Sequence, residues 1–186
     1  YLHNVILLAV CFVISILIGG VAFSPSSVQA EQADRVELVK EINPGSTGSF
    51  PDYLTTLDDH FYFNAFDGTN GYELWKSDGT ASGTQMVKDI NPGSTGSFPD
   101  YLATLDGHLY FSASDGTNGD ELWKSDGTAS GTKMVKDINP GSTGSFPNPT
   151  SYDGNLYFQA NDGTNGYELW KSDGTASGTQ MVKDIN

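Results

Sequence analysis

One phrase of 21 residues occurs three times in this chain and constrains its fold more than any other feature. "GYELWKSDGTASGTQMVKDIN" begins at Gly71 and again at Gly166, and a copy with two changes, "GDELWKSDGTASGTKMVKDIN", begins at Gly119. The valine of the "VKDIN" or "VKEIN" segment stands at positions 39, 87, 135 and 182, so the spacings are 48, 48 and 47 residues. A repeat of this length indicates units that each pack on their neighbours in the chain.

Short segments of strand character alternate with turn sequences inside each copy. In the first copy the predicted strands cover residues 52–57, 60–66, 72–77 and 84–90. Turns rich in Asp-Gly dipeptides separate them, and these are strong hairpin signals. In "HFYFNAF", alternation places Phe61, Phe63 and Ala65 on one face and Tyr62 and Asn64 on the other. No segment after Ala30 has helical periodicity with caps, so the sequence predicts an all-β array of four-stranded antiparallel units.

Four-stranded units of about 40 to 50 residues are typical of β-propeller blades. The predicted blades are residues 44–91, 92–139 and 140–186, and residues 31–43 resemble an orphan fourth strand ahead of them. Strands that are apolar on both faces indicate burial between neighbouring blades. We therefore assign the equivalent Trp75, Trp123 and Trp170 to inter-blade packing rather than to ligand stacking.

Three blades are too few to close a ring, since propellers typically have at least four. The sequence therefore predicts a fragment of a larger ring, with one open face at each end of the array. We expect these faces to expose Tyr62, Trp75, Tyr157 and Trp170. Exposed apolar faces of this kind favour self-association.

The run "ELWKSDGTASGT", with "VKDINPG" after it and "LYFSASDGTNG" before it, resembles the ELWxxDGT repeat family of secreted bacterial proteins. The resemblance covers nearly everything after Val36. It implies a propeller-like repeat protein that is secreted or displayed at the surface. It implies no chemistry, because the family has no established activity and a fold alone does not supply one.

The first thirty residues have the pattern of an export signal. Residues 5–23 carry no charge, and "SPSSVQA" follows them with small residues, Val28 and Ala30, at the positions that a signal peptidase reads. We predict a signal peptide over residues 1–30 and a secreted or cell-surface protein. An uncleaved membrane anchor is the alternative, since the apolar run is nearly long enough to span a bilayer. Cys11, the one cysteine, lies inside this segment, so the mature chain would have no thiol chemistry.

The formal net charge is −14, and no charged residue precedes Glu31. An acidic surface repels nucleic acids and anionic membranes, which excludes nucleic acid as a partner and membrane insertion after cleavage. An extracellular protein or a glycan is the partner class that we expect.

Identical copies offer little to catalysis, which needs dissimilar groups in separate roles. Glu73, Glu121 and Glu168 occupy one equivalent position, whereas His60 and His108 occupy another, with Asn155 in the third copy. No triad or metal cluster emerges, so we predict that the protein is not an enzyme and has no catalytic residue and no bound cofactor.

Calcium is the one cofactor that the Asp-Gly turns suggest. Oxygen-rich loops can bind Ca²⁺, yet the dense D-x-D-x-D-G spacing is absent and Asp-Gly also suits a tight turn on backbone grounds. A turn-forming role and calcium ligation therefore remain alternatives for Asp67, Asp78, Asp115, Asp126, Asp162 and Asp173.

Two function classes remain. The first is a non-catalytic binding or adhesion module that gains avidity from repeated sites. The second is a structural repeat of the extracellular matrix or surface layer without a discrete ligand, with calcium as a stabiliser. The copies differ mainly at three sets of positions, which either tune a ligand face or are tolerated exposed sites: Asn64/Ser112/Gln159, Phe66/Ser114/Asn161 and Tyr72/Asp120/Tyr167.

We predict that the exported protein begins at Glu31, because Val28 and Ala30 form the one good cleavage site after the apolar run. N-terminal sequencing of the exported protein checks this. Retention of residues 5–23 would show an anchored protein instead.

Overall fold

Strands account for all the regular structure in the computed structural model, which describes residues 36–185. Each sheet is antiparallel, its four strands lie in chain order, and it is formed by one repeat. No helix long and apolar enough to cross a membrane occurs in this part of the chain. The prediction of all-β, four-stranded antiparallel units is confirmed. The strands are β1 (Asp52–Leu57), β2 (His60–Phe66), β3 (Tyr72–Ser77) and β4 (Gln85–Lys88) in the first sheet; β5 (Asp100–Leu105), β6 (His108–Ser114), β7 (Asp120–Ser125) and β8 (Lys133–Lys136) in the second; and β9 (Thr150–Tyr152), β10 (Asn155–Asn161), β11 (Tyr167–Ser172) and β12 (Gln180–Lys183) in the third.

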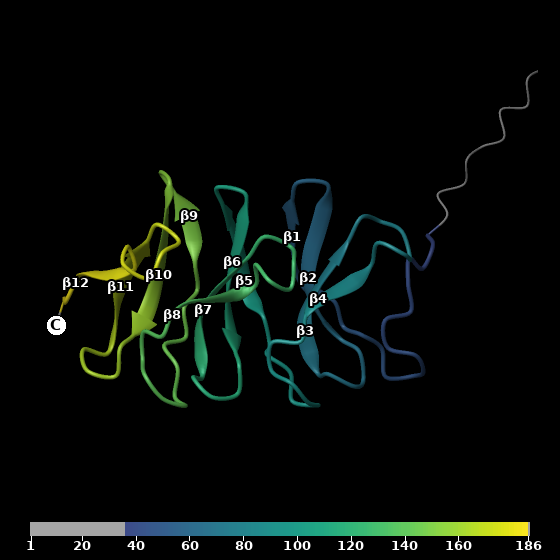
Figure 1. Ribbon diagram of the computed structural model, residues 1–186, viewed down its shortest axis with the longest axis horizontal. Coiled ribbons are helices and arrows are strands. Elements are labelled where there is room, and N and C mark those ends of the chain that lie inside the picture. The colour runs from purple at the N-terminus through teal and green to yellow at the C-terminus, as the bar shows by residue number, and fades with distance from the viewer. Residues whose placement is uncertain (1–35, 186) are drawn as a thin grey trace, which may run out of the picture. The chain divides into compact units, whose positions relative to one another are not determined.

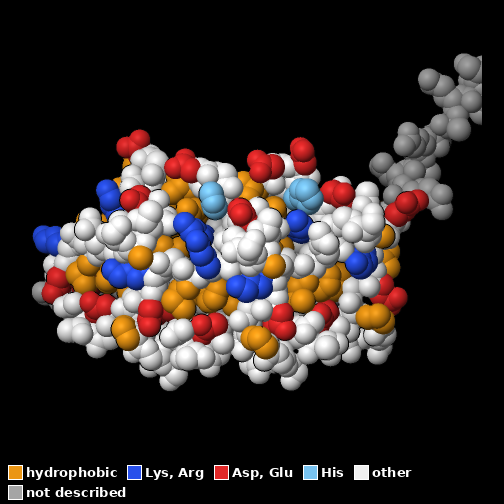
Figure 2. Space-filling view, viewed as in Figure 1, with side chains coloured by type: hydrophobic (Ala, Val, Ile, Leu, Met, Phe, Trp, Pro, Cys, Tyr) orange, Lys and Arg blue, Asp and Glu red, His pale blue; other side chains and the backbone are white. Residues whose placement is uncertain are grey.

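The three sheets follow one another in chain order within one compact unit, residues 37–186 (Figure 1). Acidic side chains line two edges of the face seen in Figure 2, and basic side chains follow a band between them. The signal peptide predicted over residues 1–30, which includes Cys11, lies outside the described residues.

An apolar core fills each space between neighbouring sheets. Tyr62 and Leu74 of the first sheet pack against Phe111 and Trp123 of the second. Tyr110, Leu122, Phe158 and Trp170 form the same arrangement between the second and third sheets. Alternate residues of one strand thus serve opposite neighbours, as the alternation in residues 60–66 predicts. Trp123 and Trp170, each 6% exposed, lie between neighbouring sheets as predicted. Trp75 is 7% exposed but packs with Phe63 and Ala65 on the other face of the first sheet, where no second sheet meets it in the described residues.

Lysine side chains add polar links across both interfaces. The ammonium group of Lys76 donates to the Gly127 carbonyl at 2.9 Å, and that of Lys88 donates to the Thr132 carbonyl at 2.8 Å. The Lys88 ammonium also lies 5.8 Å from the centre of the Trp123 ring, a cation–π distance. The next interface repeats these contacts through Lys124, Lys136 and Trp170, with Gly174 and Thr179 as acceptors.

The fourth strand of each sheet is shorter than predicted. β4 covers Gln85–Lys88, whereas the sequence predicts a strand over residues 84–90. The N–H group of Ile90 donates to the Glu73 carboxylate at 3.1 Å, and the Thr84 hydroxyl bonds to Ser77 at 2.7 Å. Both ends of the predicted segment are therefore held by side chains rather than by a strand partner.

The 47-residue spacing of the last copy corresponds to a missing β-bulge. In the first sheet the β1–β2 register shifts between Asp52 and Thr55, and the second sheet repeats this shift between Asp100 and Ala103. The β9–β10 pairing begins at Thr150, the equivalent of Thr55, and the third copy has one residue fewer just before it. A bulge holds one extra residue on one strand, so its loss shortens the third repeat by one residue.

The expectation about the open faces is wrong for three of its four aromatic residues. Tyr62, Trp75 and Trp170 are buried, and Tyr157 is half-buried. Tyr62 and Trp170 face the second sheet from opposite sides, and Trp75 packs with Phe63 near Ile42. The outer face of the third sheet instead exposes Tyr167, Leu169 and Val182.

The described part of the predicted orphan strand, residues 36–43, forms no strand. It nevertheless contacts the first sheet as β4 contacts the second. The Lys40 ammonium donates to the Thr84 carbonyl at 2.6 Å, which matches the Lys88–Thr132 contact, and Ile42 packs against the Phe63 cluster.

We expect Trp123→Ala to lower the unfolding free energy by about 3–5 kcal/mol, because it leaves a large cavity between the first two sheets. Chemical denaturation measures this. Tyr152→Ala, at a position that is 72% exposed, is the control and should change stability by less than about 0.5 kcal/mol. An equal, small effect of both substitutions would contradict the core assignment.

Candidate binding site

The repeated glutamates tie each sheet to the segment that leads into the next. The Glu73 carboxylate accepts from the N–H groups of Ile90 at 3.1 Å and Asn91 at 3.2 Å, and from the Ser97 hydroxyl at 2.5 Å. Glu121 makes the same three bonds, and Glu168 accepts from Ile185 at 3.2 Å. Burial raises the pKa of Glu73 to about 7 although these bonds oppose the shift. These carboxylates are built into the fold and are not exposed to a substrate.

The aspartates weighed as calcium ligands are engaged in their own turns. Asp67 accepts from the N–H groups of Thr69 and Asn70, and Asp78 accepts from the N–H and hydroxyl groups of Thr80. The Thr80 hydroxyl and N–H hold the pKa of Asp78 below its usual value. Within residues 36–185 no three Asp, Glu, His or Cys side chains form a group that could hold a metal ion. The same turns recur at Asp115, Asp126, Asp162 and Asp173.

His60 and His108 lie at the start of β2 and β6 and do not meet the glutamates. Their rings are 6.3 Å and 6.5 Å from Tyr62 and Tyr110, measured between ring centres. Asn155 starts β10 in the equivalent place, and its amide donates to the Asp153 carbonyl at 3.0 Å. The histidines therefore lie near the turn aspartates rather than the glutamates. Hydrogen bonds from Thr80 are the larger cause of the lowered pKa of Asp78, and His60 contributes to it; Thr128 and His108 act in the same way on the pKa of Asp126.

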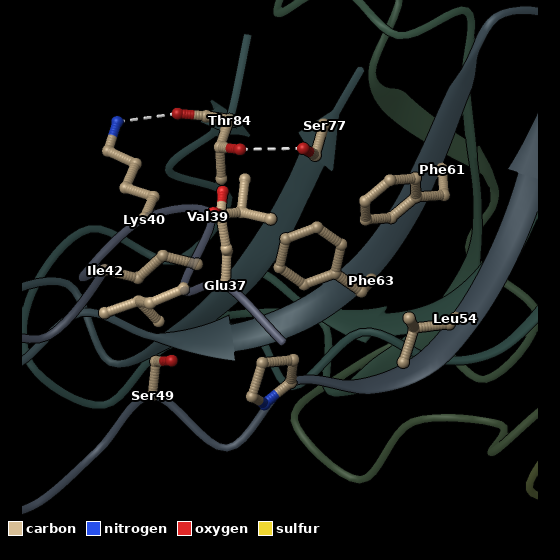
Figure 3. A pocket seen from close by; sticks show the side chains of 12 residues that line it. Glu37, Val39, Lys40, Ile42, Ser49, Leu54, Phe61, Phe63, Ser77 and Thr84 are labelled. Carbon is tan, nitrogen blue, oxygen red and sulfur yellow. Dashed lines mark hydrogen bonds between the residues drawn. The ribbon is translucent and has the colours of Figure 1, made fainter. Parts of the chain in front are cut away.

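An apolar cavity of about 360 Å³ lies on the outer face of the first sheet. In Figure 3 the rings of Phe61 and Phe63 line it opposite Val39 and Ile42, and the Lys40–Thr84 bond closes one side. In the inner interfaces a tyrosine and a leucine of the preceding sheet cover the equivalent surface. The cavity is therefore the uncovered form of a packing interface.

A second cavity, of about 300 Å³, is polar and lies between the second sheet and the segment that leads into the third. The register places three of its side chains on one face. Asp100 pairs with Ser112 across β5 and β6, and Asp120 pairs with Ser114 across β6 and β7. Ser112 and Ser114 are two residues apart and share a face, so Asp100 and Asp120 flank β6 on that face. Tyr101, Phe146 and Gln159 also line the cavity.

The carboxylates of this cavity lack compensating charge. Burial and the Asp120 charge raise the pKa of Asp100 to about 7, and a hydrogen bond from Ser112 offsets this in part. Burial also raises the pKa of Asp120. The Asp100 Oδ1 atom is buried and has no hydrogen-bond partner among the described residues. Neither lysine nor arginine is among the described residues that line the cavity.

Differences between the copies create this cavity. In the first sheet Phe66, Tyr72 and Phe98 form an aromatic row, with ring centres 5.3 Å and 5.4 Å apart. In the second sheet the first two positions are Ser114 and Asp120, and only the third keeps its aromatic ring. The space that Tyr72 fills in one sheet is thus open beside Asp120 in the next.

Sequence comparison of the copies found part of this site. Ser112, Asp120 and Gln159 are at the variable positions and line the cavity, whereas Ser114 is not among its lining residues. Asp100 was missed. Its position also varies between the copies, since the third copy has Asn148 there, and this variation could have identified it.

No family model matches the chain, and neither does any curated protein. Among solved structures, a puromycin hydrolase mutant complexed with PGG matches 76% of this chain at 12% identity, with a TM-score of 0.51. This chain spans 22% of that protein. A match to the designed protein Ika8 covers 78% of this chain and 51% of Ika8 at 13% identity. Its TM-score of 0.30 is too low to support a conclusion about the fold. The hydrolase likeness shows similarity of fold alone, and the resemblance to ELWxxDGT repeats stays a prediction.

We expect the protein to be most stable at mildly acidic pH. Folding raises the pKa of Glu73 from 4.5 and that of Asp100 from 3.8, each to about 7, so the folded state binds more protons between these values. Stability therefore falls as the pH rises through this window. The turn aspartates, with lowered pKa values, contribute stability that is lost below about pH 4.

Urea denaturation at about pH 5 and pH 8 measures this effect. Asp100→Asn should reduce the difference between the two pH values. A wild-type protein that is more stable at the higher pH would contradict the assignment.

Proposed function

We propose that this protein is a secreted, non-catalytic binding module built from propeller-like blades of the ELWxxDGT repeat type. Its sheets pack face to face through two interfaces of the same design, which is the packing that propeller blades require. The likeness to the puromycin hydrolase structure supports a shared arrangement of sheets over 76% of the chain. The charge-free run over residues 5–23 and the small residues before Glu31 support export.

One observation carries the binding role. The framework residues of the repeated phrase are occupied by structural contacts: Glu73 holds the next connector, Lys76 bonds the next sheet, and Ser77 bonds Thr84. Three of the positions that vary between copies lie at the opposite end of the same strands, where Ser112 and Asp120 line the polar cavity. A purely structural array would have no need for one such cavity in the second sheet.

The absence of catalysis is part of the proposal. The glutamates serve as hydrogen-bond acceptors for the backbone, and the histidines stand apart from them at the strand starts. Asp100 and Asp120 share one environment in which burial raises both pKa values. The two are groups of one kind, and the described lining of their cavity holds no histidine, cysteine or lysine to serve in a second catalytic role.

The second sheet can be made like the first by three substitutions taken from the chain itself: Ser112→Asn, Ser114→Phe and Asp120→Tyr. We expect this variant to melt at or above the melting temperature of the wild type and to lose at least about tenfold in ligand affinity, because an aromatic row fills the cavity. Arrays of glycans and extracellular proteins, probed with both forms of the full chain, measure the change.

Asp126→Asn is the matched control, because Asp126 lies in a turn after the other end of β7 and outside the cavity. Its binding should equal that of the wild type. Failure of the wild-type chain to bind any glycan or protein would contradict the binding role and favour the structural matrix or surface-layer repeat.

A further inference from the structure

We infer that the Asp100–Asp120 cavity binds a cationic nitrogen group, the ammonium or guanidinium head of a lysine or arginine side chain of a partner protein. This inference rests on the proposed binding function and names its ligand chemistry.

The charge of the site selects a cation. Two carboxylates flank β6 on one face, and the described lining contains no lysine or arginine to balance them. Asp100 and Asp120 are half-buried. A carboxylate that is partly removed from water without a counter-charge is costly, and a cationic ligand relieves that cost. The net charge of −14 also attracts basic partners from a distance.

The hydrogen-bonding capacity selects a nitrogen donor rather than a metal ion. Asp100 Oδ1 is a buried acceptor without a donor, and an N–H group supplies one. A calcium ion prefers six to eight oxygen ligands, whereas no group of three acidic or histidine side chains forms in the described residues. The cavity, at about 300 Å³, is also far larger than a single ion requires.

The rim suits the same ligand. Tyr101 and Phe146 line the cavity beside the carboxylates, and both are about half exposed. An aromatic face attracts ammonium and guanidinium groups, and it packs against their aliphatic stems. Phe146 is the equivalent of Phe98, whose ring stacks on Tyr72 in the first sheet. Asp120 removes that ring partner, which leaves Phe146 available to a ligand.

Calorimetric titration of the full chain tests the inference with four probes. Nα-acetyl-lysine methylamide and its arginine counterpart carry the cation, Nα,Nε-diacetyl-lysine methylamide is the neutral control, and putrescine represents a free amine. We expect the two cationic amino-acid probes to bind one per chain and the neutral probe to bind at least about tenfold more weakly. Equal binding of the neutral probe, or no binding of the cationic probes, would overturn the inference.

Two variants place the binding in this cavity. Asp120→Tyr fills it with the residue that the first and third copies carry, and Asp120→Asn removes the charge while keeping the space. Both should weaken the cationic probes at least about tenfold, and Asp115→Asn, a turn aspartate of the same sheet, should not. Unchanged binding by both Asp120 variants would overturn the assignment, and so would Ca²⁺ binding that these variants abolish.

A lysine-containing peptide, compared with putrescine, distinguishes a protein side chain from a free amine as the ligand. Tighter binding of the peptide than of putrescine supports a partner protein, whereas tighter binding of putrescine overturns the choice of partner. Array binding that Asp120→Tyr abolishes, together with no binding of the cationic probes, would leave the proposed function standing while this inference fails. Absence of binding in both the arrays and the titrations would contradict both.

Discussion

Each sheet of this chain has two apolar faces, and the fold depends on covering each face with a neighbour. Leu74 and Leu122 are fully buried because another sheet follows theirs, whereas the equivalent Leu169 is 43% exposed on the outer face of the third sheet. The same residue in the same motif thus differs in burial according to its neighbour alone. Repetition is a physical requirement here, since one sheet cannot bury either face by itself.

This constraint also accounts for the identity of the repeated phrase. Its apolar residues divide between the two faces of the sheet. Leu74 faces the next sheet, and Trp75 packs with Phe63 on the opposite face. Its polar residues add hydrogen bonds to the next unit. Lys76 donates to a carbonyl of the next sheet, and Glu73 accepts from Ser97 in the segment that leads to it. Even Gly71 is required, since a Cβ atom there would lie 2.5 Å from the Gly96 nitrogen. Glu73, Leu74 and Lys76 therefore cannot change without loss of a contact to the next unit.

Local pattern therefore predicts the first three strands of the first repeat to the residue, whereas the fourth strand, the bulge and the shorter β9 of the third repeat are not predicted. Alternation and Asp-Gly turns act within a few residues, and they define β1, β2 and β3. The end of β4 depends on Glu73, which is 17 residues from Ile90 in sequence.

The cavity is harder still to predict from the sequence. Asp100 and Asp120 meet only through the register of β6, and Phe146 arrives from the following repeat. Comparison of the copies shows which positions differ, but not that the differing residues lie around one cavity.

A repeated framework acquires a distinct site only where one copy departs from the others. The exchange of an aromatic row for Ser114 and Asp120 removes ring packing from the second sheet and adds a half-buried carboxylate beside Asp100. Both changes oppose stability, because they leave space unfilled and charge uncompensated. The surrounding framework tolerates them, since the sheet is held on both faces by interfaces that do not involve these residues. Departures from local rules that lower stability are expected at functional sites, and in the described chain this cavity is where several of them coincide.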